Sequence, residues 1–254
     1  MRRPTLVAAA IVAATIVSRA PFLSQQLWAW DSVLYARALE DGFHVDYALS
    51  GQRPHAPGYL FYVGAAALIR AIARDSNTAL VLLSAIASAL AAAALYLLAR
   101  RLAGDRAAIV VALGFAADPL VWQYSEVAYP YTVLSVLSIA LAAGFLAARG
   151  RGGRSALLAS AALGIAAGFR QDLLVILGPL WLWTVWPLTR RARVASAACV
   201  VAACGLWLVP TAMLSGGAVA YLDSLLRQAD YVRATYSVPA QGLPALAANL
   251  ATTV

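Results

Sequence analysis

The sequence contains no lysine, and charge of either sign is scarce. All nineteen basic residues are arginine, the acids number eleven, and 12% of the 254 residues are charged. A soluble domain carries about twice that charged fraction, roughly 25%. The composition therefore excludes an ordinary soluble protein. The lack of lysine, together with the abundance of alanine, is typical of a GC-rich bacterial genome.

The motifs of several common chemistries are missing as well. The sequence has no P-loop, no GxGxxG, no HExxH and no GxSxG. Neither of its two histidines has metal-ligand spacing, so no cofactor is predicted and a divalent metal is not indicated. Cys199 and Cys204 lie in an apolar run without CxxC spacing, which favours two small buried side chains. The net charge of +8 is not gathered in one patch, so nucleic acid is not an expected partner.

What the chain has in abundance is long apolar sequence, at 63% hydrophobic residues. Continuous rather than alternating runs disfavour a β-barrel and indicate an all-α, polytopic helical membrane protein embedded in a lipid bilayer. The eight runs are Leu6–Val17, Tyr59–Ile72, Thr78–Leu98, Ala107–Val121, Ala128–Ala148, Ala156–Phe169, Leu173–Trp186 and Val194–Leu214. The first run has some features of a signal peptide, but Arg19 lies within the cleavage site, so we expect an uncleaved helix.

The arginines indicate the orientation of these runs. Four short segments, around residues 2–3, 100–106, 149–154 and 190–193, hold eleven of the arginines and only one acid, Asp105. The positive-inside rule places all four segments in the cytoplasm, with the N-terminus. An even number of crossings must then separate successive segments, yet three runs lie between the first two. Tyr59–Ile72 is short and contains Arg70, so we expect it to lie along the outer interface or to dip into the membrane and return, leaving seven crossings.

The polar stretch from Ser24 to Tyr59 then lies outside, where it holds four acids and both histidines. Asp31 follows two tryptophans and precedes a short helix, so it is a candidate either for catalysis or for the N-cap, a role for which Ser32 is also suited. Arg53 and His55 lie in a proline-rich turn; arginine suits phosphate because its planar fork donates two parallel hydrogen bonds. A turn with solvated charges is the alternative.

Two further outer turns carry charge. Glu126 precedes a descending helix, where it could simply favour the positive end of the helix dipole. Arg170 and Asp172 lie in a turn between two short spans, where they could pair with each other. A polar turn at membrane depth usually faces protein or water.

Five segments together resemble the N-terminal half of GT-C superfamily glycosyltransferases, akin to protein O-mannosyltransferases and the lipid A aminoarabinose transferase. In chain order they are WDSVLYARAL, RPHAPGYLFY, LYLLARRLAGDRAA, LVWQYSEVAYPYTVL and GFRQDLLVILGPL. The resemblance implies an inverting membrane glycosyltransferase on the outer face of a bacterial inner membrane. Its donor would be a polyprenyl-phosphate-linked sugar, and its acceptor a protein, lipid or glycan.

The resemblance also implies roles for single residues. Asp31 is the expected general base. The expected contacts to the donor phosphate are Arg53, His55 and Arg170, and the acceptor or these arginines would be oriented by Glu126, Asp172 and Tyr59.

Two departures from the family pattern bear on these expectations. Ser32 follows Asp31 where many relatives have Glu, which puts a carboxylate pair or metal site in doubt. We expect residues 1–214 to form the transmembrane module, with an outer loop over residues 24–77, and residues 215–254 to begin a further outer loop that is truncated.

Two other classes of function stay open. A transporter or flippase subunit is one, although transporters tend to place ionisable groups near the bilayer midplane, whereas these acids cluster at the outer ends of the runs. A noncatalytic partner of a larger membrane enzyme is the other.

The predicted topology can be tested with a reporter fused after Arg74. We expect the reporter to be extracytoplasmic, because the run before it does not cross the membrane. A cytoplasmic signal would contradict the seven-crossing arrangement.

Overall fold

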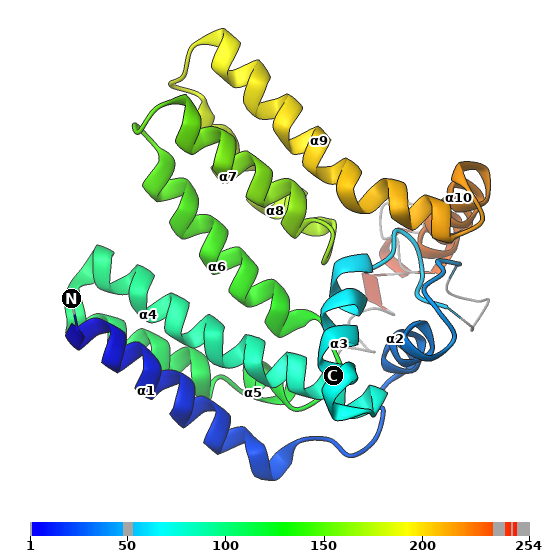
Figure 1. The fold of residues 1–254 in the computed structure, drawn as a ribbon, viewed down its shortest axis with the longest axis horizontal. Helices are drawn as coiled ribbons and strands as arrows, with labels where there is room; N and C mark the ends of the chain where they lie inside the picture. The colour runs from blue at the N-terminus through cyan, green and yellow to red at the C-terminus, as the bar shows by residue number, and fades with distance from the viewer. Residues whose placement is uncertain (1, 48–52, 236–241, 245, 248–254) are drawn as a thin grey trace.

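The computed structural model describes residues 2–47, 53–235, 242–244 and 246–247 (Figure 1). Its helices are α1 (Arg2–Arg19), the 3₁₀ turn η1 (Ala20–Phe22), α2 (Trp30–Glu40), α3 (Leu60–Ala73), α4 (Ser76–Ala117), α5 (Pro119–Ser125), α6 (Tyr131–Ala148), α7 (Gly153–Ala166), α8 (Asp172–Val185), α9 (Arg190–Leu214) and α10 (Ala218–Thr235). Within these residues there is no strand, only an isolated bridge between Asp46 and His55. The all-α prediction is confirmed.

Four of the described helices are long and apolar enough to cross a membrane: α1 with the turn after it, α4, α6 and α9. Helices α3, α7 and α8 are apolar but have only 14 residues each. A perpendicular span needs about 20 residues. A helical membrane protein is therefore confirmed, while the number of crossings stays a prediction.

Helix α4 consists of two helices that meet at Gly104. This glycine has φ 84°, outside the helical region, a conformation that glycine adopts at little cost. The chain reverses there beside the start of α1 (Figure 1), where Arg3, Tyr96 and Asp105 line one small cavity. The two apolar runs predicted on either side of the turn are thus two helices. The second ends at Ala117, earlier than expected, because the Asp118 carboxylate caps the separate helix α5.

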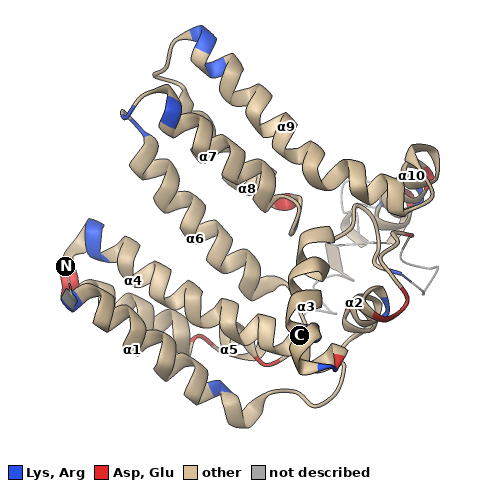
Figure 2. Cartoon of the chain, viewed as in Figure 1, with Lys and Arg blue, Asp and Glu red and all other residues tan. Residues whose placement is uncertain are grey.

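The charges separate toward two edges of the bundle. Figure 2 shows arginine at the turn within α4, around the turn between α6 and α7, and at the start of α9, all along one edge with the N-terminus. Asp105, the one acid among them, pairs with Arg100. The acids of the other turns lie toward the opposite edge, called here the acidic edge. The structure therefore groups the arginine segments as the positive-inside argument requires.

Helix α3 lies at the acidic edge, across the ends of the longer helices (Figure 1). At its start, the Phe61 amide donates to the Gly168 carbonyl over 3.0 Å. At its other end, Arg70 donates to the carbonyl of Leu39, in the last turn of α2, over 2.7 Å. Just beyond α3, Asn77 in the first turn of α4 donates to the Ser24 carbonyl over 2.9 Å. Helix α3 is thus attached at both ends to segments of the same edge, the arrangement expected of an interfacial segment.

Small residues allow close helix packing between α7 and α9. A Cβ atom on Gly164 would lie 2.6 Å from the Cβ atom of Ala203 and 2.6 Å from the carbonyl oxygen of Val200. The indole nitrogen of Trp207 donates to the Gly164 carbonyl over 3.0 Å. Close approach of small residues is how membrane helices gain packing energy without a hydrophobic driving force.

Replacing this glycine is expected to weaken the bundle. Gly164→Ala should lower the free energy of unfolding by about 1–3 kcal/mol because the added methyl group overlaps backbone. Gly144→Ala is the matched control, since a Cβ atom there meets nothing within 4 Å. Unfolding of both variants in mixed micelles, followed by tryptophan fluorescence, measures the difference. Equal stability of the two variants would contradict the packing described.

Candidate functional site

Asp31 lies in the first turn of α2 but does not cap the helix. The N-cap is Ala29, in extended conformation, and no side chain makes the capping hydrogen bond. The capping interpretation of Asp31 and Ser32 is therefore wrong. The carboxylate instead accepts a hydrogen bond from the Tyr129 hydroxyl over 3.4 Å. Its position near the positive end of the helix dipole favours its negative charge.

Ser32 points into the protein, where it ties α2 to the loop before α6. Its side chain is fully buried, and its Oγ atom donates to the Ala128 carbonyl over 2.8 Å. From α4, the Ser84 hydroxyl donates to the neighbouring carbonyl, that of Tyr129, over 2.9 Å. These two hydrogen bonds hold the loop in place, and with it the tyrosine that contacts Asp31.

Four aromatic rings gather beside Asp31. Tyr129 and Tyr131 are stacked with centroids 5.2 Å apart, Tyr124 and Tyr131 lie 4.6 Å apart, and Trp28 is 5.9 Å from Tyr129. Burial, followed by the nearby negative charge of Asp31, raises the pKa of Tyr129. Its hydroxyl therefore stays protonated and available as a donor near neutral pH.

Arg170 reaches the same place from the turn before α8. Its Nε atom pairs with the Asp172 carboxylate over 2.9 Å, so the pairing considered from the sequence is present. Its guanidinium also lies 5.1 Å from the centre of the Tyr131 ring. Burial lowers the pKa of Arg170, but Tyr59, Tyr131 and Asp172 together outweigh it and the pKa is raised. Gly168 permits this placement, since a Cβ atom there would lie 2.4 Å from the Phe61 ring.

Tyr59 is affected by the charges of both Asp31 and Arg170. Its side chain is buried, and its ring meets that of Tyr35 edge to face at 5.2 Å. Burial raises the pKa of Tyr59 to about 12; the positive charge of Arg170 opposes that shift and the negative charge of Asp31 adds to it. Both charges therefore lie within electrostatic reach of this one phenol.

His55 orients this phenol. Its Nδ1 atom lies 3.0 Å from the Ala56 carbonyl, which can only accept, so Nδ1 carries the proton of the neutral ring. Its Nε2 atom, 3.3 Å from the Tyr59 hydroxyl, is then the acceptor of a hydrogen bond from Tyr59. A neutral His55 in this position has no N–H left for another ligand.

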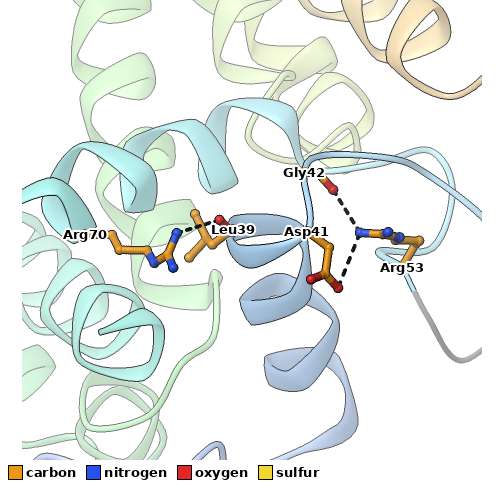
Figure 3. Close-up of polar contacts among 5 residues, drawn as sticks. All are labelled: Leu39, Asp41, Gly42, Arg53 and Arg70. Carbon is orange, nitrogen blue, oxygen red and sulfur yellow. Dashed lines mark hydrogen bonds and ion pairs between the residues drawn. The ribbon is translucent and has the colours of Figure 1, made fainter. Parts of the chain in front are cut away.

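Arg53 lies outside this group. It donates to the Gly42 carbonyl over 3.0 Å, and its guanidinium is 3.9 Å from the Asp41 carboxylate (Figure 3). Asp41 follows the end of α2, about 15 Å from Asp31 at 1.5 Å per helical residue. The structure therefore does not bring Arg53 to the other residues expected to bind phosphate.

Glu126 faces a second buried cation, Arg19. Burial raises the pKa of Glu126, while a hydrogen bond with Trp122 and the charge of Arg19 oppose the shift. Arg19 is 2% exposed, donates to the Ser18 and Ser125 hydroxyls, and lies 4.0 Å from the centre of the Trp122 ring. This group ties α1 to α5 and does not include Asp31.

Comparison with known proteins identifies the family. The family model described as dolichyl-phosphate-mannose-protein mannosyltransferase matches residues 55–214. The chain belongs to this family. No curated protein and no solved structure matches it. The family confirms the resemblance derived from the sequence and makes the chain a membrane glycosyltransferase with a polyprenyl-phosphate-linked sugar donor.

The matched range of this mannosyltransferase family begins at His55, so it includes five of the seven predicted site residues. Asp31 and Arg53 precede it. The structure nevertheless places Asp31 against Tyr129, which lies within the matched range. Four residues that sequence reasoning did not single out, Tyr35, Tyr129, Tyr131 and Arg19, take part in these contacts. A signal for two of them was present in the sequence, because Tyr129 and Tyr131 recur at alternate positions directly after Glu126.

In this family member, the described residues contain no group of three or more metal-ligating side chains. Ser32 is fully buried and bonded to the Ala128 carbonyl, so a longer carboxylate at this position would have to displace that packing. The arrangement is that of Asp31 with one hydroxyl donor, Tyr129, linked through the stacked ring of Tyr131 to the Arg170–Asp172 pair.

The buried position of Ser32 gives a testable prediction. Ser32→Ala should cost about 1–3 kcal/mol, because the Ala128 carbonyl loses its partner. Ser32→Glu should cost more, since it buries a charge. Ser24→Ala is the control, because that hydroxyl bonds to Gln26 in an exposed position, and we expect less than about 0.5 kcal/mol. Chemical unfolding measures all three; a stable Ser32→Glu variant would contradict the orientation described.

Proposed function

We propose that the chain transfers a sugar from a polyprenyl-phosphate-linked donor to an acceptor hydroxyl at the acidic edge, which faces the outside of a bacterial inner membrane. Asp31 is the general base. The observation that carries the proposal is a series of contacts that links Asp31 to Arg170. The Tyr129 hydroxyl donates to Asp31 over 3.4 Å, the Tyr129 ring stacks on Tyr131, and the Arg170 guanidinium lies 5.1 Å from the centre of the Tyr131 ring. A base and a phosphate-binding cation at one site are what this reaction needs.

The transfer requires one bond to form as another breaks. Asp31 accepts the proton of the acceptor hydroxyl while the acceptor oxygen bonds to C1 of the sugar. The bond from C1 to the phosphate oxygen breaks, and its electron pair stays on the leaving polyprenyl phosphate. Attack from the face opposite the phosphate inverts the configuration at C1. Tyr129, which donates to Asp31, holds the carboxylate in place.

Arg170 is the group that we assign to the leaving phosphate. It is held by Asp172 through Nε, and it lies over Tyr131, with which it also shares a side-chain hydrogen bond. Negative charge grows on the phosphate as the bond to C1 breaks, so a fixed guanidinium stabilises the transition state more than the ground state. His55 is reassigned from phosphate contact to orienting Tyr59, and Arg53 and Glu126 to structural roles.

An apolar cavity of about 480 Å³ supports a lipid-linked donor. It begins at Tyr124 and Tyr131 and continues along α6 past Ser135 to Ile139. Its upper end thus adjoins the ring beneath Arg170. A phosphate held by Arg170 would place an attached prenyl chain at the mouth of this cavity, where burial of apolar surface favours it.

The domain organisation belongs to the same proposal. Residues 1–214 form the transferase module, and residues 215–254 begin an outer loop. Helix α10, the described part of that loop, contacts the module through the Tyr221 hydroxyl, which donates to the Pro57 carbonyl over 2.8 Å. Residues 236–241, 245 and 248–254 lie outside the described residues.

Asp31→Asn is the decisive variant. We expect it to lower sugar transfer from polyprenyl-phosphate donors about 10²–10⁴-fold, the contribution typical of a positioned base. The asparagine can still accept from Tyr129, so the fold should persist. Asp41→Asn is the control, because it changes the same carboxylate to an amide at the far, exposed end of α2. Product is measured by the release of polyprenyl phosphate.

Full activity of Asp31→Asn in an active preparation would show that Asp31 is not the base. No transfer with any donor, accompanied by solute uptake into vesicles, would favour a transporter instead. Inactivity in both assays would favour a noncatalytic partner.

A further inference from the structure

The exposed side of α3 is an apolar stripe with no protein against it among the described residues. It consists of Gly64, Ala67, Leu68, Ala71 and Ile72, spaced three and four residues apart, and every one is exposed. Leu68 and Ile72 are 76% and 86% exposed. The opposite side of α3 holds the buried residues Tyr62, Val63 and Ala66. A helix with this division suits the boundary between lipid chains and headgroups.

Two arginines border the stripe near the end of α3. Arg70 and Arg74, one helical turn apart, line a shallow cavity of about 270 Å³ together with Ala67 and Ala71. The small alanine side chains leave room beside the two guanidinium groups. Two cations one turn apart repel each other, so a shared anion would stabilise this arrangement.

The charges of the two arginines are only partly satisfied within the protein. Arg70 donates one N–H to the Leu39 carbonyl over 2.7 Å (Figure 3). Hydrogen bonds from Thr78 and, to a lesser extent, the charge of Arg70 lower the pKa of Asp75. The Asp75 carboxylate is, however, engaged as the N-cap of α4, where it accepts from the Thr78 amide. Arg74 is exposed, and no described residue bonds to its side chain. Guanidinium groups of this kind bind phosphate through paired N–H donors.

Arg74 also has an unusual backbone. Its φ of 61° makes it the only residue other than glycine with positive φ in the described part of the chain. Glycine or asparagine commonly ends a helix in this conformation, and a larger residue is held there at some cost. The turn directs the chain into α4 and leaves Arg74 beside the cavity.

We propose that Arg70, Arg74 and the apolar stripe of α3 bind an anionic phospholipid of the outer leaflet. The two guanidinium groups hold its phosphate, and its acyl chains lie along Leu68 and Ile72. The occupant is inferred from the charge of the cavity and from the apolar surface continuous with it. This site is separate from the one assigned to transfer, because it lies at the opposite end of α3 from Tyr59.

Lipid binding to the purified full chain tests the proposal without a sugar donor, so its outcome is independent of the transfer reaction. Native mass spectrometry in detergent micelles would compare phosphatidylglycerol with phosphatidylcholine carrying the same acyl chains. We expect wild type to retain at least one more phosphatidylglycerol. Arg74→Gln should weaken that binding about fivefold, the contribution of one arginine near a lipid headgroup.

Arg227→Gln is the matched control. It removes the same charge from α10, where Arg227 pairs with Asp223 over 2.8 Å, and should leave phosphatidylglycerol binding unchanged. Arg74→Gln is preferred to an Arg70 variant because it leaves the hydrogen bond to Leu39 in place. Equal losses in Arg74→Gln and Arg227→Gln would overturn the proposal, since they would indicate a response to net charge alone.

A second measurement separates a lipid site from a simple anion site. The paired change Leu68→Ser and Ile72→Ser should weaken phosphatidylglycerol binding while Arg70 and Arg74 are intact. Inorganic phosphate, added at the same concentration as the lipid, should compete poorly with it. Full displacement of the lipid by inorganic phosphate, or unchanged affinity in the paired variant, would overturn the assignment to a phospholipid.

Discussion

The cost of placing charge in a bilayer organises this molecule. A charged side chain at the centre of the membrane is expensive, and the chain responds by keeping ionisable groups at the ends of its helices. The arginine segments gather at one edge (Figure 2), and most acids lie toward the other. Chemistry that uses ionised groups is therefore confined to the turns. The acidic edge is the place where turns from different parts of the chain meet.

Hydrogen bonds to backbone carbonyls turn that meeting place into a defined geometry. Ser32 and Ser84 hold the loop that carries Tyr129, and Arg70 bonds a carbonyl near the end of α2. Helix α2 is thus held near both ends, with Asp31 in its first turn. Because a buried hydrogen bond is costly to leave unmade, these contacts make the position of Asp31 depend on two serines and on Arg70, none of which bonds to Asp31 itself.

Arg170 and Arg74 show how the surroundings of an arginine change what its charge can do. Arg170 is half-enclosed by Tyr59, Tyr131 and Asp172, so its charge is fixed in place beside the candidate base. Arg74 is exposed at the end of α3. A guanidinium held by its partners can stabilise charge that develops during a reaction, whereas an exposed one is accessible to a bound anion.

The sequence by itself determined the class of the protein, the helical runs, the grouping of most arginines at one edge and the turns that carry the candidate site. These features follow from composition and from the lengths of the apolar runs, because each segment that enters lipid must satisfy its own polar backbone groups and contain few charges. It also predicted that Tyr59–Ile72 differs from the other runs, and α3 does lie across their ends. Sequence could not decide which charged residues face one another, since that depends on contacts between residues far apart in the chain.

Tertiary structure made those choices. Arg53 and His55 are two residues apart, yet one pairs with Asp41 and the other bonds to Tyr59. Glu126 and Tyr129 belong to one loop, yet the carboxylate turns toward Arg19 and the phenol toward Asp31. Neighbours in an irregular segment point in directions set by the partners that packing supplies. Only the folded chain shows that Asp31 accepts a hydrogen bond from the Tyr129 hydroxyl, whereas its sequence neighbour Ser32 donates one to the Ala128 carbonyl.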